Sequence, residues 1–487
     1  MRPAGHLTNG VIRHIIHWYS KRLAVFVLGE LSAEKLYIFE KMKVPGAVMK
    51  LVVPSVLSQL VTLIYNVADT FFVGRTGDTY QVAAVSMAYT LYFVLAAIGS
   101  LYGIGGGSLI SRYLGARRID RVKKASSFSF YASLLTTLAV SILTYLTLTP
   151  VLKVLGASEN TFGFCWDYCF WVVVIGGLPT VAALVMGHLL RSEGYSRQAG
   201  FGVAFGGILN ILLDPVFIFG LHMGVKGAAI ATLISNVLAV GYYLLTFRAL
   251  RGKLLVTLSP AHFRPEREIV GQVFMIGMPA FISTILTTCA NTLSFNLISG
   301  YGDVPVAAFG VTKKMDLIPM SLCMGIANGI LPLIAYNYSS GNHRRMRASF
   351  WFGMGIGLCF GFLYLAAGRL FGAELVRLFI TADETTVACG ESFVHVECLA
   401  VPFMVVNNLM NTMFQAMGKG VPSLILSACR SALLKMPATI LMNALIGLIG
   451  IIWSQFATET AMLIVTFSLF AWLMRRLKRK TDAASAE

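Results

Sequence analysis

The feature that most constrains this chain is a series of apolar stretches, each about twenty residues long, that recur along most of its length. A stretch of this length can cross the ~30 Å hydrocarbon core of a membrane as a helix, which satisfies its backbone polar groups internally. The chain is 56% hydrophobic and only 13% charged, with a mean hydropathy of +0.74, whereas about a quarter of the residues in an ordinary soluble domain are charged. The sequence therefore excludes a soluble fold and predicts an all-α polytopic membrane protein.

Apolar runs separated by clusters of charged residues predict about twelve spans, whose ends are uncertain by ~4 residues. The expected spans are 50–74, 81–110, 125–149, 163–190, 200–220, 227–247, 271–299, 305–336, 347–370, 390–417, 423–445 and 448–474.

Basic residues gather in alternate loops, and the loops between them are almost free of charge. The basic loops contain Arg112, Arg117, Arg118, Arg121, Lys123, Lys124, Arg191, Arg197, Arg248, Arg251, Lys253, Arg264, Arg267, Arg344, Arg345 and Arg347. Because cytoplasmic loops carry an excess of Lys and Arg, we expect a multi-pass protein of the cell membrane with both termini in the cytoplasm. The same loops account for the net charge of +17, so we expect contacts with membrane lipids and none with nucleic acid.

Residues 1–48 do not fit the pattern of spans. The apolar run at 23–28 is too short to cross a membrane and follows Lys21 and Arg22. We expect a cytoplasmic or interfacial extension here, and a cleaved signal peptide is the alternative.

An internal repeat relates the two halves of the chain by a shift of about 225 residues. The shift superposes Gly77-Asp78 on Gly302-Asp303 and Pro54 on Pro279. Because six spans return the chain to its starting side, the halves are expected to be parallel six-helix bundles, an architecture of transporters with a cavity between the halves. The expected divisions are an extension at 1–48, an amino-terminal lobe at 49–247, a basic cytoplasmic linker at 248–270, a carboxy-terminal lobe at 271–474 and a basic cytoplasmic tail at 475–487.

Two acidic residues stand inside the predicted spans of the first half, Asp69 in the first and Asp214 in the fifth. An acidic residue at membrane depth costs ~2.5–3.5 kcal/mol on insertion scales, so it tends to face the bundle interior and to act there. Asn210 lies one helical turn before Asp214, which puts their oxygens on one face. Carboxylate, amide and hydroxyl oxygens suit a small cation such as Na⁺, and the same carboxylates could instead carry a proton.

A purely structural role for the two acids is the alternative, in which each caps a broken helix or bonds to neighbouring backbone. The repeat counterpart of Asp69 is Ser294, and that of Asp214 lies near Met436, so the acid pair exists in one half only. A structural device would be expected in both halves of a duplicated fold. The asymmetry therefore favours a functional pair.

Three stretches of the chain resemble the multidrug and toxic compound extrusion (MATE) family. They are 66–74, 210–215 and 334–338, the last closely followed by Gly341-Asn342, and the resemblance extends over about residues 45–475. In that family an Asp of the first span, an Asn and an Asp of the fifth and a Thr of the sixth form a cation site in the amino-terminal lobe. The resemblance implies that this site consists here of Asp69, Asn210, Asp214 and Thr232.

The resemblance also implies a hinge at Pro54, because a Pro of the first span is linked to bending of that helix in the family. Some members carry acidic groups in the carboxy-terminal lobe, and this sequence departs from them at Ser294. A second ion site in that lobe is thereby put in doubt.

Other ionisable residues within the predicted spans are candidates for the lining of a central cavity. They are Lys313, Asp316, Glu397 and Glu459. Lys313 and Asp316 are one turn apart, so they could instead neutralise each other. His188, beside Arg191 and Glu193, is expected at a solvated cytoplasmic interface.

The leading hypothesis is secondary active efflux of amphiphilic or cationic small molecules in exchange for Na⁺ or H⁺ by alternating access. We expect a monomer with no cofactor and no metal other than a coupling Na⁺. A flippase for lipid-linked saccharides is the alternative, but it would be expected to have an Arg-lined cavity, and only Lys313 and Lys314 offer positive charge there. An intramembrane enzyme is not expected, because the spans contain no HExxH, GxSxG or clustered acidic metal-diphosphate motif.

Overall fold

The computed structural model describes residues 37–76, 79–154, 157–377 and 384–484. Within these ranges the chain is almost entirely helical and contains no β-strand. Eleven helices are long and apolar enough to cross a membrane, and a bent pair of helices brings the number to twelve if it is one span. The all-α fold and the number of spans expected from the sequence are confirmed. Residues 1–36 of the expected extension and Gly77-Asp78 of the repeat lie outside the described residues.

The first half of the chain forms seven α-helices and three π-helical turns. They are η1 (Tyr37–Lys41), α2 (Val44–Gly74), α3 (Thr79–Gly115), α4 (Ile119–Val154), α5 (Glu159–Cys169), η2 (Phe170–Ile175), α6 (Gly177–Ser192), α7 (Ser196–Pro215), η3 (Val216–Gly220) and α8 (Gly224–Ala249). A linker with one 3₁₀ turn, η4 (Pro260–His262), leads to the second half.

The second half repeats this organisation. Its elements are α9 (Arg267–Ser299), α10 (Asp303–Ser339), α11 (His343–Leu370), α12 (Gly372–Arg377), α13 (Glu384–Ala416), α14 (Gly420–Ala428), η5 (Cys429–Lys435), α15 (Met436–Ile446) and α16 (Leu448–Ala484).

The fourth span is bent by 48° between η2 and α6, whereas the sequence predicts one straight run at 163–190. The bend follows a π-helical turn, after which the N–H of Gly176 donates to the carbonyl of Trp171 at 2.9 Å. Pro179 then has no N–H with which to continue the ladder. π-Helical turns, Gly and Pro are known causes of helix kinks. The span is predicted from hydrophobicity, which carries no information about such a bend.

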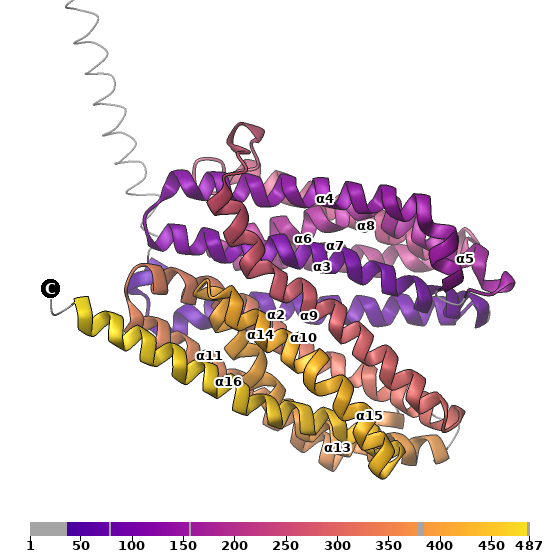
Figure 1. The fold of residues 1–487 in the computed structure, drawn as a ribbon. Coiled ribbons are helices and arrows are strands. Elements are labelled where there is room, and N and C mark those ends of the chain that lie inside the picture. Colours follow the sequence, from indigo (N-terminus) through magenta and orange to yellow (C-terminus); the bar gives the residue numbers. More distant parts are fainter. Residues whose placement is uncertain (1–36, 77–78, 155–156, 378–383, 485–487) are drawn as a thin grey trace, which may run out of the picture.

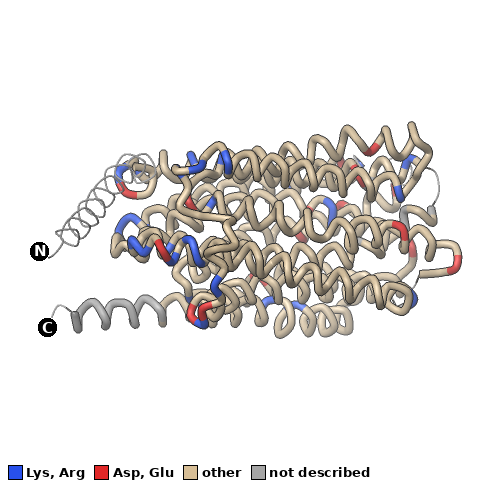
Figure 2. The backbone as a smooth tube through the Cα atoms, turned by 90° about the horizontal axis from the view of Figure 1, so that it is seen from above, with Lys and Arg blue, Asp and Glu red and all other residues tan. Residues whose placement is uncertain are grey.

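The helices of the two halves form two groups, which lie against each other at one end and diverge toward the other (Figure 1). Lys and Arg concentrate at the end where the groups meet (Figure 2), and this end carries the basic loops of the sequence. We call it the basic end.

Packing crosses between the halves at the basic end. The first turns of α2, including Val48 and Val52, share a hydrophobic cluster with α10 and α13 of the second half. Ile269 and Val273 at the start of α9 belong in turn to the cluster of α3, α4 and α6. The lobe boundaries at 49–247 and 271–474 therefore stay a prediction, since α2 and α9 each pack with both halves.

The segment η1 contacts both halves beside this crossing. Phe39 stacks on Tyr336 of α10 with ring centroids 4.9 Å apart, and its carbonyl accepts a hydrogen bond from Arg345 Nε at 2.6 Å. Glu40 pairs with Arg117 in the loop after α3 at 2.9 Å. Residues just before the first span therefore tie the two halves together.

Helices α3 and α9 approach each other so closely that their backbones touch. A Cβ added at Gly277 of α9 would lie 2.0 Å from the carbonyl oxygen of Leu101 on α3, and one added at Gly105 would lie 2.3 Å from that of Val273. Within a membrane, small residues permit the close van der Waals packing that holds helices together. The close contact between α3 and α9 thus depends on these two glycines.

We predict that Gly277→Val destabilises the protein by about 1–3 kcal/mol, because overpacking forces α3 and α9 apart. Thermal unfolding of the purified protein in detergent measures the change. Gly271→Val is the matched control, since a Cβ at Gly271 on the same helix meets nothing within 4 Å. Equal melting temperatures for the two variants would contradict the contact.

Candidate functional site

Four polar side chains predicted as a cation site lie on three adjacent helices of the first half. Asp69 is on α2, Asn210 and Asp214 are on α7, and Thr232 is on α8. Helix α7 packs against both α2 and α8. Asp214 is fully buried, Asn210 is 3% exposed and Asp69 is 9% exposed, so the acids face the protein interior.

Asn210 connects the members of this group on α7 and α8. Its amide nitrogen Nδ2 donates to Asp214 Oδ1 at 3.2 Å and to Thr232 Oγ1 at 3.2 Å. These two bonds use the N–H groups of the amide and not its carbonyl oxygen Oδ1, which could therefore accept a hydrogen bond or bind a cation. The two carboxylates, Asp69 and Asp214, also interact electrostatically with each other.

Three buried oxygens of this group have no hydrogen-bond donor in the part of the chain that the structure describes. They are Asp69 Oδ1, Asn210 Oδ1 and Asp214 Oδ2. Buried polar atoms are nearly always partnered, and each exception requires an explanation. Three such oxygens on neighbouring helices are what the coordination of a small cation, or the protonation of a carboxylate, would satisfy.

The end of α7 positions Asp214. Pro215 has no N–H to donate, and the chain passes directly from this proline into the π-helical turn η3. A change from α- to π-helical winding alters the direction of the following side chains. Asp214 therefore sits at a local irregularity, as intramembrane functional groups often do.

Pro54 lies within α2, which continues through it as one helix. Nearby hydroxyl groups bond to the backbone, since Ser55 Oγ donates to the carbonyl of Leu51 at 2.9 Å and Ser58 Oγ to that of Ser55 at 2.8 Å. Such bonds often accompany bending of a helix. The hinge role of Pro54 stays a prediction.

Three of the four candidate cavity residues, all in the second half, form ion pairs with one another. Lys313 Nζ on α10 donates to Asp316 Oδ2 at 2.9 Å and to both carboxylate oxygens of Glu397 on α13, at 2.6 and 2.9 Å. The Glu397 side chain is only 3% exposed. Of the two readings of Lys313 and Asp316, this geometry favours mutual neutralisation, with Glu397 as a third member.

Glu459 on α16 is also held by a cation. Its Oε1 accepts hydrogen bonds from Arg430 Nε at 2.9 Å and Nη2 at 2.5 Å, and its Oε2 accepts one from Asn407 at 2.9 Å. Sequence reasoning missed Arg430, and it also missed Lys435, which donates to Ser454 Oγ at 3.0 Å. Both lie inside the predicted span 423–445. A basic residue within a span is energetically costly, so their position in the sequence could have marked them as candidates.

The two halves thus treat their acids differently. Each buried carboxylate of the second half has a cationic side chain beside it. Among the described residues of the first half, Asp69 and Asp214 form no ion pair. An uncompensated pair of buried carboxylates is strongly unfavourable, and this is the penalty that a bound cation or a proton would relieve.

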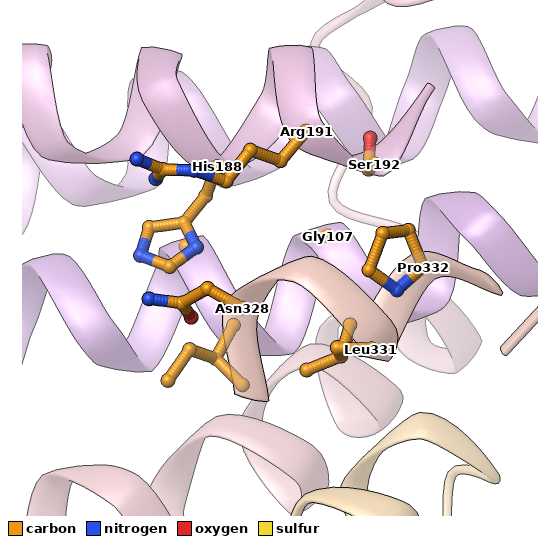
Figure 3. Close-up of a pocket in the computed structure, with 9 residues that line it drawn as sticks. Gly107, His188, Arg191, Ser192, Asn328, Leu331 and Pro332 are labelled. Carbon is orange, nitrogen blue, oxygen red and sulfur yellow. The ribbon is translucent and has the colours of Figure 1, made fainter. Parts of the chain in front are cut away.

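A small cavity of about 10 Å³ lies where α3, α6 and α10 meet, with room for about one water (Figure 3). In Figure 3 the side chain of His188 points from α6 toward Asn328 on α10. Arg191 is 7% exposed and Glu193 is 1% exposed. The expected solvated interface is therefore wrong. Arg191 donates to Ser58 of α2 in the interior of the first half, and the linker covers Glu193, whose Oε1 accepts hydrogen bonds from the N–H groups of Leu255 and Val256.

Comparison with known proteins finds a match to the MatE family model over residues 54–216 and again over 279–441. Both ends of the match are offset by 225 residues, as the internal repeat predicts. The multidrug export protein MepA of Staphylococcus saprophyticus is 32% identical over 437 residues, which cover 89% of this chain and 96% of that protein.

Solved structures share the fold. An outward-facing conformation of a multidrug resistance MATE family transporter of the MOP superfamily matches with a TM-score of 0.84 at 22% identity, over 90% of this chain and 98% of that one. A MATE protein in the straight conformation matches with a TM-score of 0.85 at 22% identity, over 91% and 99%. The two-lobe repeat expected from the sequence is confirmed.

We predict that Lys313→Met destabilises the protein by ~3–5 kcal/mol, because it leaves the buried Glu397 carboxylate without its cation. The double variant Lys313→Met with Glu397→Gln should recover most of this loss, since it also removes the charge of the buried Glu397 and leaves only that of Asp316, whose side chain is 29% exposed. Denaturant or thermal unfolding in detergent measures the stability of the wild type, the single variant and the double variant. Lys314→Met is the control, because this neighbouring lysine is exposed; the paired-charge interpretation fails if both lysine variants behave alike.

Proposed function

This chain belongs to the MatE family, and from that membership and the geometry of its first half we propose that it is a secondary active multidrug exporter. It exchanges lipophilic or cationic small molecules for Na⁺ or H⁺ by alternating access. It is a transporter and not an enzyme.

One observation carries the coupling proposal, namely the three buried oxygens without donors at Asp69, Asn210 and Asp214. They lie on helices of one half, and Thr232 stands beside them through its bond with Asn210. A cation or proton that enters this site removes the penalty of two buried negative charges. The site therefore has a reason to bind a cation whenever water reaches it.

Among its described residues the second half offers no comparable site, because Lys313 and Arg430 already lie beside its buried carboxylates. The positive charge of a Lys or Arg side chain is part of the chain, so it cannot be exchanged for an ion across the membrane. This contrast supports one coupling site, in the first half.

The charge of the loops orients this conformation in the membrane. The positive-inside rule assigns the basic end to the cytoplasm, together with both termini. The halves meet at that end and diverge at the other (Figure 1), so this conformation corresponds to one in which the cytoplasmic side is closed. Export then requires the contacts between the halves at the basic end to separate.

Charge balance limits the substrates that a single site can drive. Exchange of one cation for a monovalent cationic substrate moves no net charge, so the membrane potential contributes nothing. Only the chemical gradient of the ion remains, ~1.4 kcal/mol per tenfold, which supports about tenfold accumulation for each tenfold gradient. Stronger accumulation requires a neutral substrate or a second coupling ion.

The flippase alternative is less well supported. It requires basic side chains that can bind a pyrophosphate. Lys313 is already bonded to Asp316 and Glu397, and Arg430 to Glu459, so neither is available for that task. Lys435, which donates to Ser454, would be left as a single basic side chain among those identified in these spans. Drug efflux therefore remains the preferred function.

We predict that Asp214→Asn abolishes gradient-driven export while leaving the protein folded, because the amide keeps the volume but removes the charge and the protonatable group. Export of a fluorescent cation from proteoliposomes measures this, under a Na⁺ gradient at constant pH and separately under a pH gradient without Na⁺. The arm that drives wild-type export identifies the ion. Wild-type rates for Asp214→Asn in the driving arm would refute the site.

Two further variants calibrate this test. Thr232→Ala removes one neutral ligand, so it should raise the ion concentration needed for half-maximal export more than it lowers the maximal rate. Ser294→Ala, at the repeat counterpart of Asp69, should export nearly normally. Equal loss of activity in all variants would indicate a general defect and not loss of an ion ligand.

A further inference from the structure

A second cavity, of about 640 Å³, opens at the basic end of the first half, away from the candidate ion site. The starts of α2 and α7, the turn before α7 and the segment after α8 form its walls. Its lining includes Met49, Lys50, Val53, Glu193, Arg197 and Lys253.

The cavity presents positive charge to the solvent. Lys50, Arg197 and Lys253 line it and are exposed. Its one acidic lining residue, Glu193, is buried, and its Oε1 accepts hydrogen bonds from the backbone N–H groups of Leu255 and Val256. The accessible charge of the lining is therefore that of the three cations, which favours an anionic ligand.

An apolar surface continues from the cavity along the two helices that wall it. On α2, Met49 and Val53 line the cavity and Leu57 follows one turn later, and all three are exposed. On α7, Phe201 follows Arg197 by one turn, and Ile208 and Leu212 continue the same face in exposed positions. Because α2 packs against α7, the basic cavity lies at the head of a two-helix apolar surface.

We propose that this cavity is a binding site for an anionic phospholipid. The phosphate lies against Lys50 and Arg197, with Lys253 at the rim, and the acyl chains lie along α2 and α7. Helices α2 and α7 begin at this level, where phospholipid headgroups stand, and a soluble anion would leave the apolar surface unused.

The site has a consequence for α2, because Pro54 also lines the cavity. A lipid bound here contacts the turn of α2 on which the expected hinge stands, so it favours the conformation of α2 in which the cavity is open. Binding at this site does not depend on the proposed transport activity and can be measured without it.

The test reconstitutes the full chain in phosphatidylcholine vesicles that contain a trace of photo-crosslinkable phosphatidylglycerol or, separately, photo-crosslinkable phosphatidylcholine. Cross-linked peptides are mapped by mass spectrometry. We expect peptides containing residues 49–57 and 197–212 to be labelled at least tenfold more by the phosphatidylglycerol probe. Equal labelling by the two probes would overturn the proposal.

The variant Lys50→Gln/Arg197→Gln/Lys253→Gln should lose this preference, by a factor on the order of a hundred in affinity, because each basic residue near an anionic lipid contributes about a factor of five. The matched control is Arg118→Gln/Arg344→Gln/Arg347→Gln, which removes three exposed charges of the basic end that do not line the cavity. The control should keep the preference. Equal loss in both variants would assign the effect to general surface charge.

Two further arms complete the test. Excess inorganic phosphate should not displace the lipid probe, and displacement would reassign the cavity to a soluble anion. Thermal unfolding in detergent checks that the triple variant folds. If it does not, the single variant Lys50→Glu replaces it, and unchanged labelling of that variant would overturn the proposal.

Discussion

The cost of holding a charge away from water governs how the polar side chains of this protein are arranged. In the second half the chain meets this cost itself, since Lys313 lies against Glu397 and Arg430 against Glu459. In the first half Asp69 and Asp214 have no such cation among the described residues, and each carboxylate has a buried oxygen without a hydrogen-bond donor there. One physical rule thus separates a half whose buried carboxylates are paired within the chain from a half whose buried carboxylates are not, and the proposed coupling site rests on that difference.

This difference is superimposed on a repeated backbone. The family match recurs with a constant offset, and each half contributes a first and a second long helix to the crossing between the halves. Side-chain chemistry breaks the symmetry, because Asp69 has Ser294 as its counterpart. A duplicated scaffold can carry a site in one copy alone, since function resides in particular residues and not in the fold.

The contacts between the halves at the basic end are of a kind that can separate. Ser108 of α3 donates to the carbonyl of Gln415 on α13 at 2.6 Å, and Arg112 donates to Gln272 on α9 at 3.1 Å. Lys124 pairs with Glu266 of the linker and lowers the pKa of that carboxyl through the hydrogen bond between them. Apolar clusters, close helix contacts at small residues and these polar bonds together hold the junction.

The sequence by itself determined the helical class, the number of spans and the repeat, because hydrocarbon permits few ways to satisfy a backbone and because duplication leaves a constant offset. It also identified Asp69 and Asp214, because an acidic residue within an apolar span is energetically costly and is therefore recognisable from the sequence alone. Only the tertiary structure decided that the fourth span is bent, that Arg191 is buried, and that Arg430 is the partner of Glu459. These features depend on which distant segments lie side by side, and hydrophobic patterning constrains the faces of a helix but not the neighbours that those faces meet.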